Sequence, residues 1–534
     1  MAQPEKNHTF KVLVADQLSE DGIKLLKDEP ALSVDVKTGL SSKELADIVG
    51  PYDALIVRSS TKVTAEVIAK AGRLKVIGRA GVGLDNVDAD AATKRGIVVM
   101  NVPAGNTIST AEQTFSLILA LARRIPQADA SLRAGKWERS KFVGTELFGK
   151  TLGVVGLGKI GTEVAKRAQA FSMRILAYDP FVSKERAHQL EFELTDLKTL
   201  YATADFITVH TPLTNETRHL IGAKEIAMMK SGVRLINCAR GGIIDEKALY
   251  DAITSGKVAG AALDVYEEEP PKENPLCTLE QVVCTPHLGA STQEAQLNVA
   301  IDVVKQVADA LLGRGIRNAV NMPNVDAQTL KVLQPYILLG EKLGSLASQL
   351  AGQIGEIRVT YVGEMTAHDT SAVTLAVLKG VLQPIVGENV NYVNASLIAA
   401  ERGIKVVEAK ASQMDEFANL LAVDVRGNGA ELAIRGTLSP RREPRIVKID
   451  RYFIEASPEG YMLIIRNQDK PGLIGSLGTL LGEAKINIAG MSNGRDKPGG
   501  EAVTVVNIDN PVPPAVLEKV KKLTHVLDAK LITL

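Results

Sequence analysis

Short aliphatic and β-branched runs alternate with amphipathic segments over residues 10–290, and this alternation restricts the possible folds more than any other feature of the sequence. The predicted N-terminal strands are KVLVAD (11–16), DALIVRSST (53–61) and LKVIGRAG (74–81). Helices are predicted between them, from Ser19, Ser41 and Thr64. Strands that alternate with helices pair in parallel, because the helices cover both faces of the sheet. A second series of the same kind begins at Thr151, so we expect two α/β domains.

Two long helical segments indicate how these domains are connected. The apolar periodicity from Ser109 to about Ala134 predicts one helix with a kink at Pro126. The segment after Thr292 is long enough for a helix that returns the chain to the first domain. We therefore predict one domain from residues 1–102 and 288–318, and a second from residues 103–287.

The sequence changes character after Gly313, where NAVNMPNVD (318–326) is linker-like. Residues 319–451 mix helical runs with strands and are predicted to form a separate α+β domain. Residues 452–534 give the order strand, helix, strand, strand, helix, strand. That order is the βαββαβ pattern of ferredoxin-like domains. The chain is thus predicted to have an α/β half that carries the chemistry and a non-catalytic α+β half.

The glycine-rich segment GLGKIG (156–161) lies between a predicted strand and a predicted helix. Its glycines permit a tight turn, and the start of the helix stabilises a pyrophosphate. Asp179 ends the next strand, where a carboxylate accepts from ribose hydroxyls and disfavours a 2′-phosphate. We therefore expect a Rossmann-like NAD site that includes Gly156, Gly158 and Gly161. The alternative is a strand–helix turn with only a structural role.

Arg240 and His287 each follow an apolar strand, VRLIN and QVVC respectively. An arginine can hold a substrate carboxylate with two parallel hydrogen bonds, which fixes the carbon that loses a hydride. A neutral imidazole can accept the hydroxyl proton as the hydride leaves. Taken singly, Arg240 can be an exposed loop arginine and His287 a structural histidine. Together they predict hydride transfer from a 2-hydroxy acid.

The run LDVYEEEP (263–270) supplies the acids that lie between these two residues in the sequence. A carboxylate behind an imidazole fixes its tautomer and stabilises the imidazolium. The pattern alone does not decide whether Glu267, Glu268 or Glu269 pairs with His287, and consecutive glutamates are often a solvated turn. Asp264, which closes its strand, can instead face the nicotinamide.

The composition excludes several classes of function. Lys and Arg total 62, as do Asp and Glu, so the zero net charge gives no general attraction to nucleic acid or anionic membranes. We expect neither as a partner. Three cysteines, unevenly spaced, suit neither a disulfide framework nor a zinc site, so we expect no metal. With no signal-peptide pattern at the N-terminus and no membrane-length apolar run, a cytoplasmic location is expected.

These motifs together resemble the D-isomer-specific 2-hydroxyacid dehydrogenase family. The segments that carry the resemblance are GRAGVGLDNVD (78–88), GLGKIG, INCARGG, AALDVYEEEP and CTPHLGAST. The resemblance spans about residues 8–318. It implies that residues 1–102 with 288–318 bind substrate, that 103–287 bind NAD, and that Arg240, Glu269 and His287 are catalytic. It further implies substrate contacts from Arg58, Arg79 and Arg240. The implied cofactor contacts are Val82, Gly156, Gly158, Lys159, Ile160, Gly161, Asp179, Thr211, Cys238, Ala239, Arg240, Asp264, His287, Gly289 and Ala290.

Within this family the chain is most similar to long members that oxidise 3-phospho-D-glycerate, the first step of phosphorylated serine synthesis. The segments that support this are VRSSTKVT, GKWERSKF and HLGASTQEAQ. A phosphate needs clustered cations, and Arg58, Lys62, Arg79 and Lys141 are available. The alternatives are another D-2-hydroxy acid of the glycerate, glyoxylate or 2-hydroxyglutarate type, or a non-catalytic NAD-sensing corepressor-like scaffold.

The last predicted domain resembles the ACT domain, which binds amino acids. RNQDKPGLIG (466–475) and INIAGM (486–491) carry this resemblance. It implies that Asn467, Asp469 and Asn487 are candidates for an effector, expected to be L-serine, and that the chain forms a homodimer or homotetramer. A purely structural assembly domain is the alternative. The resemblance also implies that 319–451 are an intervening regulatory domain, where Arg441, Arg442 and Arg445 bind an anion or belong to a solvated linker.

Overall fold

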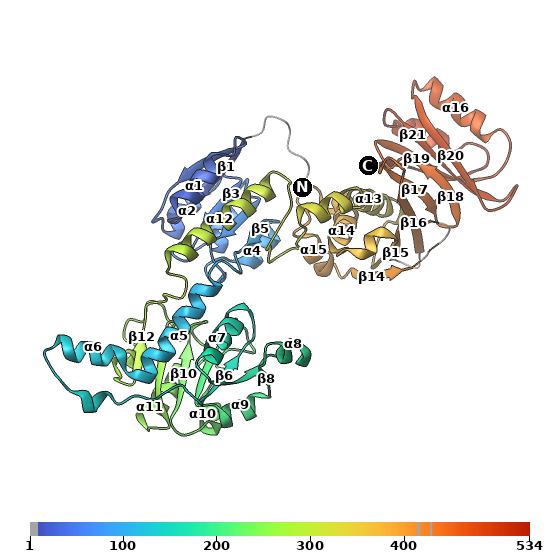
Figure 1. Cartoon of the computed structure of the whole chain (residues 1–534). Coiled ribbons are helices and arrows are strands. Elements are labelled where there is room, and N and C mark those ends of the chain that lie inside the picture. Colours follow the sequence, from blue (N-terminus) through green and yellow to red (C-terminus); the bar gives the residue numbers. More distant parts are fainter. Residues whose placement is uncertain (1–8, 413, 415–416, 428–429) are drawn as a thin grey trace.

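The computed structural model describes residues 9–412, 414, 417–427 and 430–534. Four sheets organise this part of the chain, and each sheet has its own helices. Figure 1 shows the first two sheets in the blue-to-green part of the chain and the other two in the yellow-to-red part. In the part described, no helix is both long enough and apolar enough to cross a membrane.

The first domain is built on a five-stranded parallel sheet in the order β2-β1-β3-β4-β5. Its strands are β1 (Phe10–Val14), β2 (Leu32–Val36), β3 (Ala54–Val57), β4 (Val76–Arg79) and β5 (Val98–Met100), and its helices are α1 (Glu20–Lys27), α2 (Ser42–Ile48), α3 (Ala65–Lys70) and α4 (Ala89–Lys94). The later helix α12 (Gln293–Leu311) returns to this sheet, because Val299, Val303 and Val307 share a core with β1, β3 and β4.

The second domain has a seven-stranded parallel sheet in the order β12-β11-β10-β9-β6-β7-β8. Its strands are β6 (Thr151–Val155), β7 (Arg174–Tyr178), β8 (Glu193–Leu194), β9 (Phe206–Val209), β10 (Val233–Asn237), β11 (Val258–Leu263) and β12 (Val282–Cys284). Its helices are α7 (Lys159–Ala170), α8 (Lys184–Gln189), α9 (Leu197–Thr203), α10 (Ala223–Met228) and α11 (Glu246–Thr254), with 3-10 turns η1 (Arg139–Phe142) and η2 (Pro275–Thr278). Loops that leave β10, β11 and β12 at their carboxyl ends face the first domain.

The single helix predicted from Ser109 to Ala134 is instead two helices, α5 (Thr107–Arg123) and α6 (Ile125–Arg133). Arg124 between them has φ +54°, a left-handed conformation that ends α5. Pro126 lies in the first turn of α6, where its missing N–H costs no intrahelical hydrogen bond. The prediction of one kinked helix was therefore wrong, and the proline marks a helix start.

The third domain has a six-stranded sheet in the order β14-β13-β15-β16-β17-β18. Its elements are α13 (Ala327–Ala351), β13 (Glu356–Val362), η3 (Glu364–Ala367), α14 (Ser371–Val386), α15 (Ala395–Glu401), β14 (Lys405–Ala411), β15 (Leu420–Gly427), β16 (Ala430–Leu438), β17 (Pro444–Ile449) and β18 (Tyr452–Ala456). We predicted that the last domain starts at residue 452. Because β18 pairs with β17, residues 452–456 belong to the third sheet instead.

The last domain has the order β19 (Tyr461–Gln468), α16 (Leu473–Glu483), β20 (Ile488–Arg495), β21 (Glu501–Ile508), α17 (Pro514–Lys521) and β22 (Val526–Thr533). Its antiparallel sheet has the strand order β20-β21-β19-β22. The first strand and the last strand therefore lie side by side, as in a ferredoxin-like domain. This confirms the predicted βαββαβ fold.

Candidate active site

A cavity of about 570 Å³ lies between the first two domains. Loops after the carboxyl ends of parallel strands line it on both sides, which is where α/β sheets bind their ligands. The first domain contributes Arg58, Ser60 and Arg79, and the second contributes Arg240, Glu269 and His287. Residues that lie far apart in the sequence therefore share one cavity.

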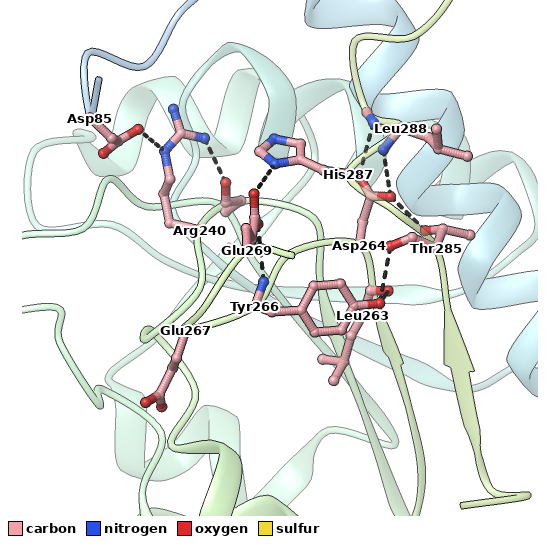
Figure 2. Close-up of polar contacts among 12 residues, drawn as sticks. Asp85, Arg240, Leu263, Asp264, Tyr266, Glu267, Glu269, Thr285, His287 and Leu288 are labelled. Atoms are coloured by element: carbon pink, nitrogen blue, oxygen red, sulfur yellow. Dashed lines mark hydrogen bonds and ion pairs between the residues drawn. The ribbon is translucent and has the colours of Figure 1, made fainter. Parts of the chain in front are cut away.

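Glu269 pairs with His287 (Figure 2). Nδ1 of His287 lies 2.8 Å from Oε2 of Glu269, and the other carboxylate oxygen accepts from the backbone N–H of Tyr266 at 3.1 Å. Partial burial alone would raise the pKa of Glu269, but the His287 imidazole, the Tyr266 N–H and the charge of Arg240 hold it below its ordinary value. The carboxylate is therefore ionised at neutral pH and can stabilise an imidazolium.

The other two glutamates of the run point elsewhere. Glu267 lies 3.1 Å from Nε2 of His219, and Figure 2 shows it directed away from His287. Glu268 is exposed, 3.6 Å from Lys272. The geometry thus separates three acids that the sequence pattern left equivalent.

Asp264 fixes the turn that carries His287. Its side chain is fully buried and accepts from the Thr285 hydroxyl at 2.5 Å and from the backbone N–H groups of Leu288 and Gly289 at 2.8 Å each. His287 itself has φ +53°, a left-handed conformation that this anchoring stabilises. These three hydrogen bonds hold the turn in place and use three of the roughly four acceptor sites of the carboxylate.

Arg240 follows β10 in a loop that Asn237 shapes. The Asn237 amide donates to the Arg240 carbonyl at 2.8 Å and accepts from the Ala239 N–H at 3.0 Å. The guanidinium donates through Nη1 to the Ala239 carbonyl at 2.7 Å, and through Nε to Asp85 of the first domain at 3.1 Å. Asp85 was not among the predicted site residues, and nothing in its local sequence indicated a partner 155 positions away.

Arg58 and Arg79 bring two further positive charges to the cavity. Burial, and then the charge of Arg240, lowers the pKa of Arg79 to about 10, so it remains a cation at neutral pH. Its buried Nε has no hydrogen-bond partner among the described residues, as expected of a donor that awaits an anion. Asp16 holds the Arg58 loop by accepting from the Arg58 N–H at 2.6 Å and from the Ser60 hydroxyl.

Of the two lysines predicted to help bind a phosphate, only one lines the cavity. Lys62 lines the cavity, whereas Lys141 lies in η1 and pairs with Glu138 at 2.6 Å. The polar residues that line the cavity and that sequence reasoning missed include Ser60, Asn106 and Gln296. Asn106 has a signal that could have been recognised, since Asn is common at the N-cap position and Asn106 directly precedes helix α5.

The residues around GLGKIG fit a dinucleotide. Strand β6 ends at Val155 and helix α7 begins at Lys159, so the turn between them is at a helix N-terminus. A Cβ on Gly161 would lie 2.0 Å from the Gly156 carbonyl oxygen, so only glycine permits this close turn, and Gly158 faces open space. The Thr211 hydroxyl is buried without a partner in the part of the chain described, and thus offers a group to a ligand.

Other predicted cofactor residues are distributed around this turn. Asp179 follows β7 and accepts from the N–H groups of Leu157 and Phe181 at 2.8 Å each, which ties it to the glycine turn. Val82 and Ala290 line the cavity. Burial raises the pKa of the Cys238 thiol to about 12, so this residue can contribute packing but not a thiolate.

The three effector candidates lie in the last domain and have separate partners. Asn467 is buried and accepts from the Thr504 hydroxyl at 2.9 Å. Asp469 pairs with Arg495 at 2.8 Å, and the Asn487 amide donates to Asp509 at 2.8 Å. Each of the three side chains is therefore paired with a different residue, and none of these contacts joins one candidate to another.

Comparisons with known proteins identify the family. A family model described as "D-isomer specific 2-hydroxyacid dehydrogenase, NAD binding domain" matches residues 115–289. Models of the D-3-phosphoglycerate dehydrogenase intervening domain and of the ACT domain match residues 332–450 and 461–525. D-3-phosphoglycerate dehydrogenase of Archaeoglobus fulgidus is 51% identical over 529 residues, which cover 98% of this chain and 100% of that relative. The chain belongs to the D-3-phosphoglycerate dehydrogenase family.

Further members of the family and solved structures agree with this assignment. The Bacillus subtilis D-3-phosphoglycerate dehydrogenase is 44% identical over 526 residues, 98% of this chain and 100% of that protein. A solved structure of D-lactate dehydrogenase from Aquifex aeolicus with NAD and lactic acid is similar to this chain, with 31% sequence identity and a TM-score of 0.53. The match covers 59% of this chain and 100% of that chain. The predicted fold class, and NAD as the cofactor, are confirmed.

Proposed function

We propose that this chain oxidises 3-phospho-D-glycerate to 3-phosphohydroxypyruvate with NAD, the first step of phosphorylated serine synthesis. The observation that carries the proposal is the His287–Glu269 pair, which lies beside Arg240 in a cavity that also contains Arg58 and Arg79. A base, a carboxylate anchor and additional cations are what an anionic 2-hydroxy acid requires. Relatives named D-3-phosphoglycerate dehydrogenase across archaea, bacteria and plants support the substrate.

His287 and Glu269 would move the proton in this reaction. Nδ1 of His287 is held by Glu269, so Nε2 is the atom that accepts the proton of the substrate C2 hydroxyl. The ionised Glu269 stabilises the imidazolium that results and keeps the ring in one orientation. NAD, when bound, supplies the hydride acceptor. In the reverse direction the imidazolium donates the same proton.

Arg240 would orient the substrate carboxylate with its guanidinium, and the C2–H bond is thereby fixed relative to the cofactor side of the cavity. Arg79, Arg58 and Lys62 line the first-domain side, where they would receive the phosphate. Ser60 lies on the same loop, and its hydroxyl donates to Asp16. A substrate with a phosphate on C3 can therefore contact both domains at once.

The cofactor would lie along the second domain. The GLGKIG turn and the start of α7 would hold the pyrophosphate, and Asp179 would accept from the ribose hydroxyls. Thr211 would donate its hydroxyl, which has no hydrogen-bond partner among the described residues. The turn from His287 to Ala290 would lie next to the nicotinamide end.

Initial rates of NADH formation test the proposed substrate. We expect kcat/KM for 3-phospho-D-glycerate to exceed that for D-glycerate, D-lactate and D-2-hydroxyglutarate by at least about 10², since the phosphate adds charge-assisted hydrogen bonds. A preference for one of the other acids would reassign the substrate within the same chemistry. Binding of NAD without turnover of any of them would favour the corepressor-like scaffold.

The ACT domain supports a finer proposal, that L-serine is an effector which binds near Asn467, Asp469 and Asn487. Because these side chains have separate partners here, effector binding would have to exchange at least one of those contacts, for example Asp469 with Arg495. Rates with and without L-serine, repeated with Asn487→Ala, test this. If L-serine does not inhibit the wild-type chain, the remaining role for the ACT domain is assembly.

We also propose that the chain forms a homodimer or homotetramer and works in the cytoplasm. Large apolar side chains are exposed along the arm that α6 and η1 form, including Leu132, Trp137 and Val143, and an assembly interface would cover them. Three free cysteines suit a reducing compartment. Light scattering on the purified chain gives the oligomeric state directly.

A further inference from the structure

Asp85 makes a contact across the domain boundary that the chemistry above does not use. It lies between β4 and α4 in the first domain, whereas Arg240 follows β10 in the second. Its Oδ2 accepts from Nε of Arg240 at 3.1 Å, and Figure 2 shows this pair beside the imidazole of His287. Asp85 also lines the cavity, so the pair is part of the space where the substrate would bind.

The donors of the Arg240 guanidinium are unequally occupied. Nε is taken by Asp85, and Nη1 donates to the Ala239 carbonyl. A Cβ on Gly83 would lie only 2.0 Å from Nη2, so Gly83 and Asp85 of the same loop lie against Nη2 and Nε respectively. The outer edge, formed by Nη1 and Nη2, retains donors for a second acceptor. A fork of two parallel N–H groups is the geometry that a carboxylate matches.

We propose that Asp85 is a positioning residue for Arg240. It holds Nε, so that the outer edge of the guanidinium is presented to the substrate carboxylate. Because Asp85 and Arg240 belong to different domains, the arginine is correctly oriented only when the two domains have the arrangement seen here. This inference rests on the proposed function, since it concerns the carboxylate of the same substrate.

Two consequences of removing Asp85 have opposite signs, which makes the inference testable. Loss of a negative charge near the cavity would by itself attract an anionic substrate and lower its KM. Loss of the acceptor at Nε would release the guanidinium and raise the KM. The side chain of Asp85 is 68% exposed, so solvent and salt screen its charge, whereas the orientation of the guanidinium is a local effect. We therefore expect the KM to rise.

The test compares Asp85→Ala and Asp85→Asn with Asp90→Ala as the matched control. Asp90 is an exposed carboxylate in α4 of the same domain and does not line the cavity. The KM for 3-phospho-D-glycerate is expected to rise about fivefold in Asp85→Ala, while kcat changes less than about twofold. The rise should be smaller in Asp85→Asn, because the amide oxygen still accepts from Nε. The KM for NAD should not change, and Asp90→Ala should behave as wild type.

A double-mutant cycle separates positioning from a general structural effect. In an Arg240→Ala background, Asp85→Ala should cause no further loss of kcat/KM. A KM that falls or stays constant in both Asp85 variants would overturn the inference, and so would additive losses in the cycle. Failure of the wild-type chain to oxidise 3-phospho-D-glycerate would count against the proposed substrate alone. The Asp85 comparison would then be made on the 2-hydroxy acid that is turned over, because each of them carries the carboxylate.

Discussion

The acidic turn 267–269 forms two histidine–glutamate pairs that look alike in isolation. His287 and Glu269 lie 2.8 Å apart, with side chains 48% and 38% exposed. His219 and Glu267 lie 3.1 Å apart, with side chains 43% and 39% exposed. Neither distance nor exposure therefore distinguishes a general base from an ordinary surface contact.

The surroundings distinguish the two pairs. The His287 pair opens into the cavity and lies next to Arg240, which can hold a substrate carboxylate. The His219 pair has a second carboxylate, Asp245, at 3.9 Å, and Glu267 also accepts from the N–H of Glu246 at 3.3 Å. It therefore connects the loop after β9 to the start of α11. A histidine–carboxylate pair becomes catalytic through the substrate-binding groups that surround it.

Replacement of the two histidines gives the largest predicted difference. His287→Ala should lower kcat by ~10²–10⁴, the usual contribution of a general base. His219→Ala should leave kcat within about twofold of wild type, because its partners lie outside the cavity. Stopped-flow measurement of NADH formation, with NAD and substrate saturating, provides both values. Equal losses of kcat in the two variants would mean that a place in the cavity does not determine which histidine is the general base.

Arginine-to-lysine substitutions beside each pair come next in size. Arg240→Lys keeps the charge but loses the planar fork, so kcat/KM for 3-phospho-D-glycerate should fall by roughly 10–10². Arg218→Lys, which changes an exposed arginine next to His219, is the control and should have little effect. If the two substitutions are equivalent, the carboxylate is not held by Arg240.

Substitution of the two glutamates should also distinguish the pairs, with a smaller change in kcat. Glu269→Gln keeps a hydrogen bond to His287 but removes the charge that stabilises the imidazolium, and kcat should fall about tenfold. Glu267→Gln should leave kcat unchanged and instead lower thermal stability. The Glu267 carboxylate accepts from the backbone N–H of Glu246 at 3.3 Å, and the backbone N–H of Glu267 donates to the Glu246 carboxylate at 2.7 Å. If Glu267→Gln lowered kcat and Glu269→Gln did not, the carboxylate that supports catalysis would be Glu267.

Sequence reasoning located the ends of the strands well and the directions of side chains poorly. Arg240 follows β10 and His287 follows β12, with β11 between them in the parallel sheet. Because the carboxyl ends of parallel strands lie at one edge of a sheet, their presence at the same edge was predictable. Which glutamate faces His287 depends on the backbone angles of a short turn, and no periodicity specifies those. Only the family resemblance singled out Glu269.

Long-range pairing and helix breaks were the other features that the sequence did not reveal. Asp85 contacts Arg240 only because two domains meet, and nothing in a loop of mixed composition signals such a contact. The break between α5 and α6 depends on the left-handed conformation of Arg124, which a non-glycine residue rarely adopts. Apolar periodicity continues across it, so a single helix was predicted.

The smallest predicted difference concerns the pH dependence of stability. The pKa of Glu269 in the folded chain lies below its ordinary value because, although partial burial opposes this, His287 and the Tyr266 N–H stabilise the carboxylate. A carboxyl group with a lowered folded pKa stabilises the fold fully above its unfolded pKa, roughly 4.3, and loses this contribution as the pH falls through the folded value. Glu269→Gln lacks this contribution at every pH.

The Tm of wild type should therefore exceed that of Glu269→Gln by about 1 °C between pH 8 and pH 6, and the gap should close as the pH falls below about 4. Differential scanning fluorimetry across this range measures the gap. In a His287→Ala background the largest stabilising partner is absent, so the gap should be smaller at neutral pH. A gap that widens on acidification would mean that Glu269 is not stabilised as a carboxylate by His287 and the Tyr266 N–H.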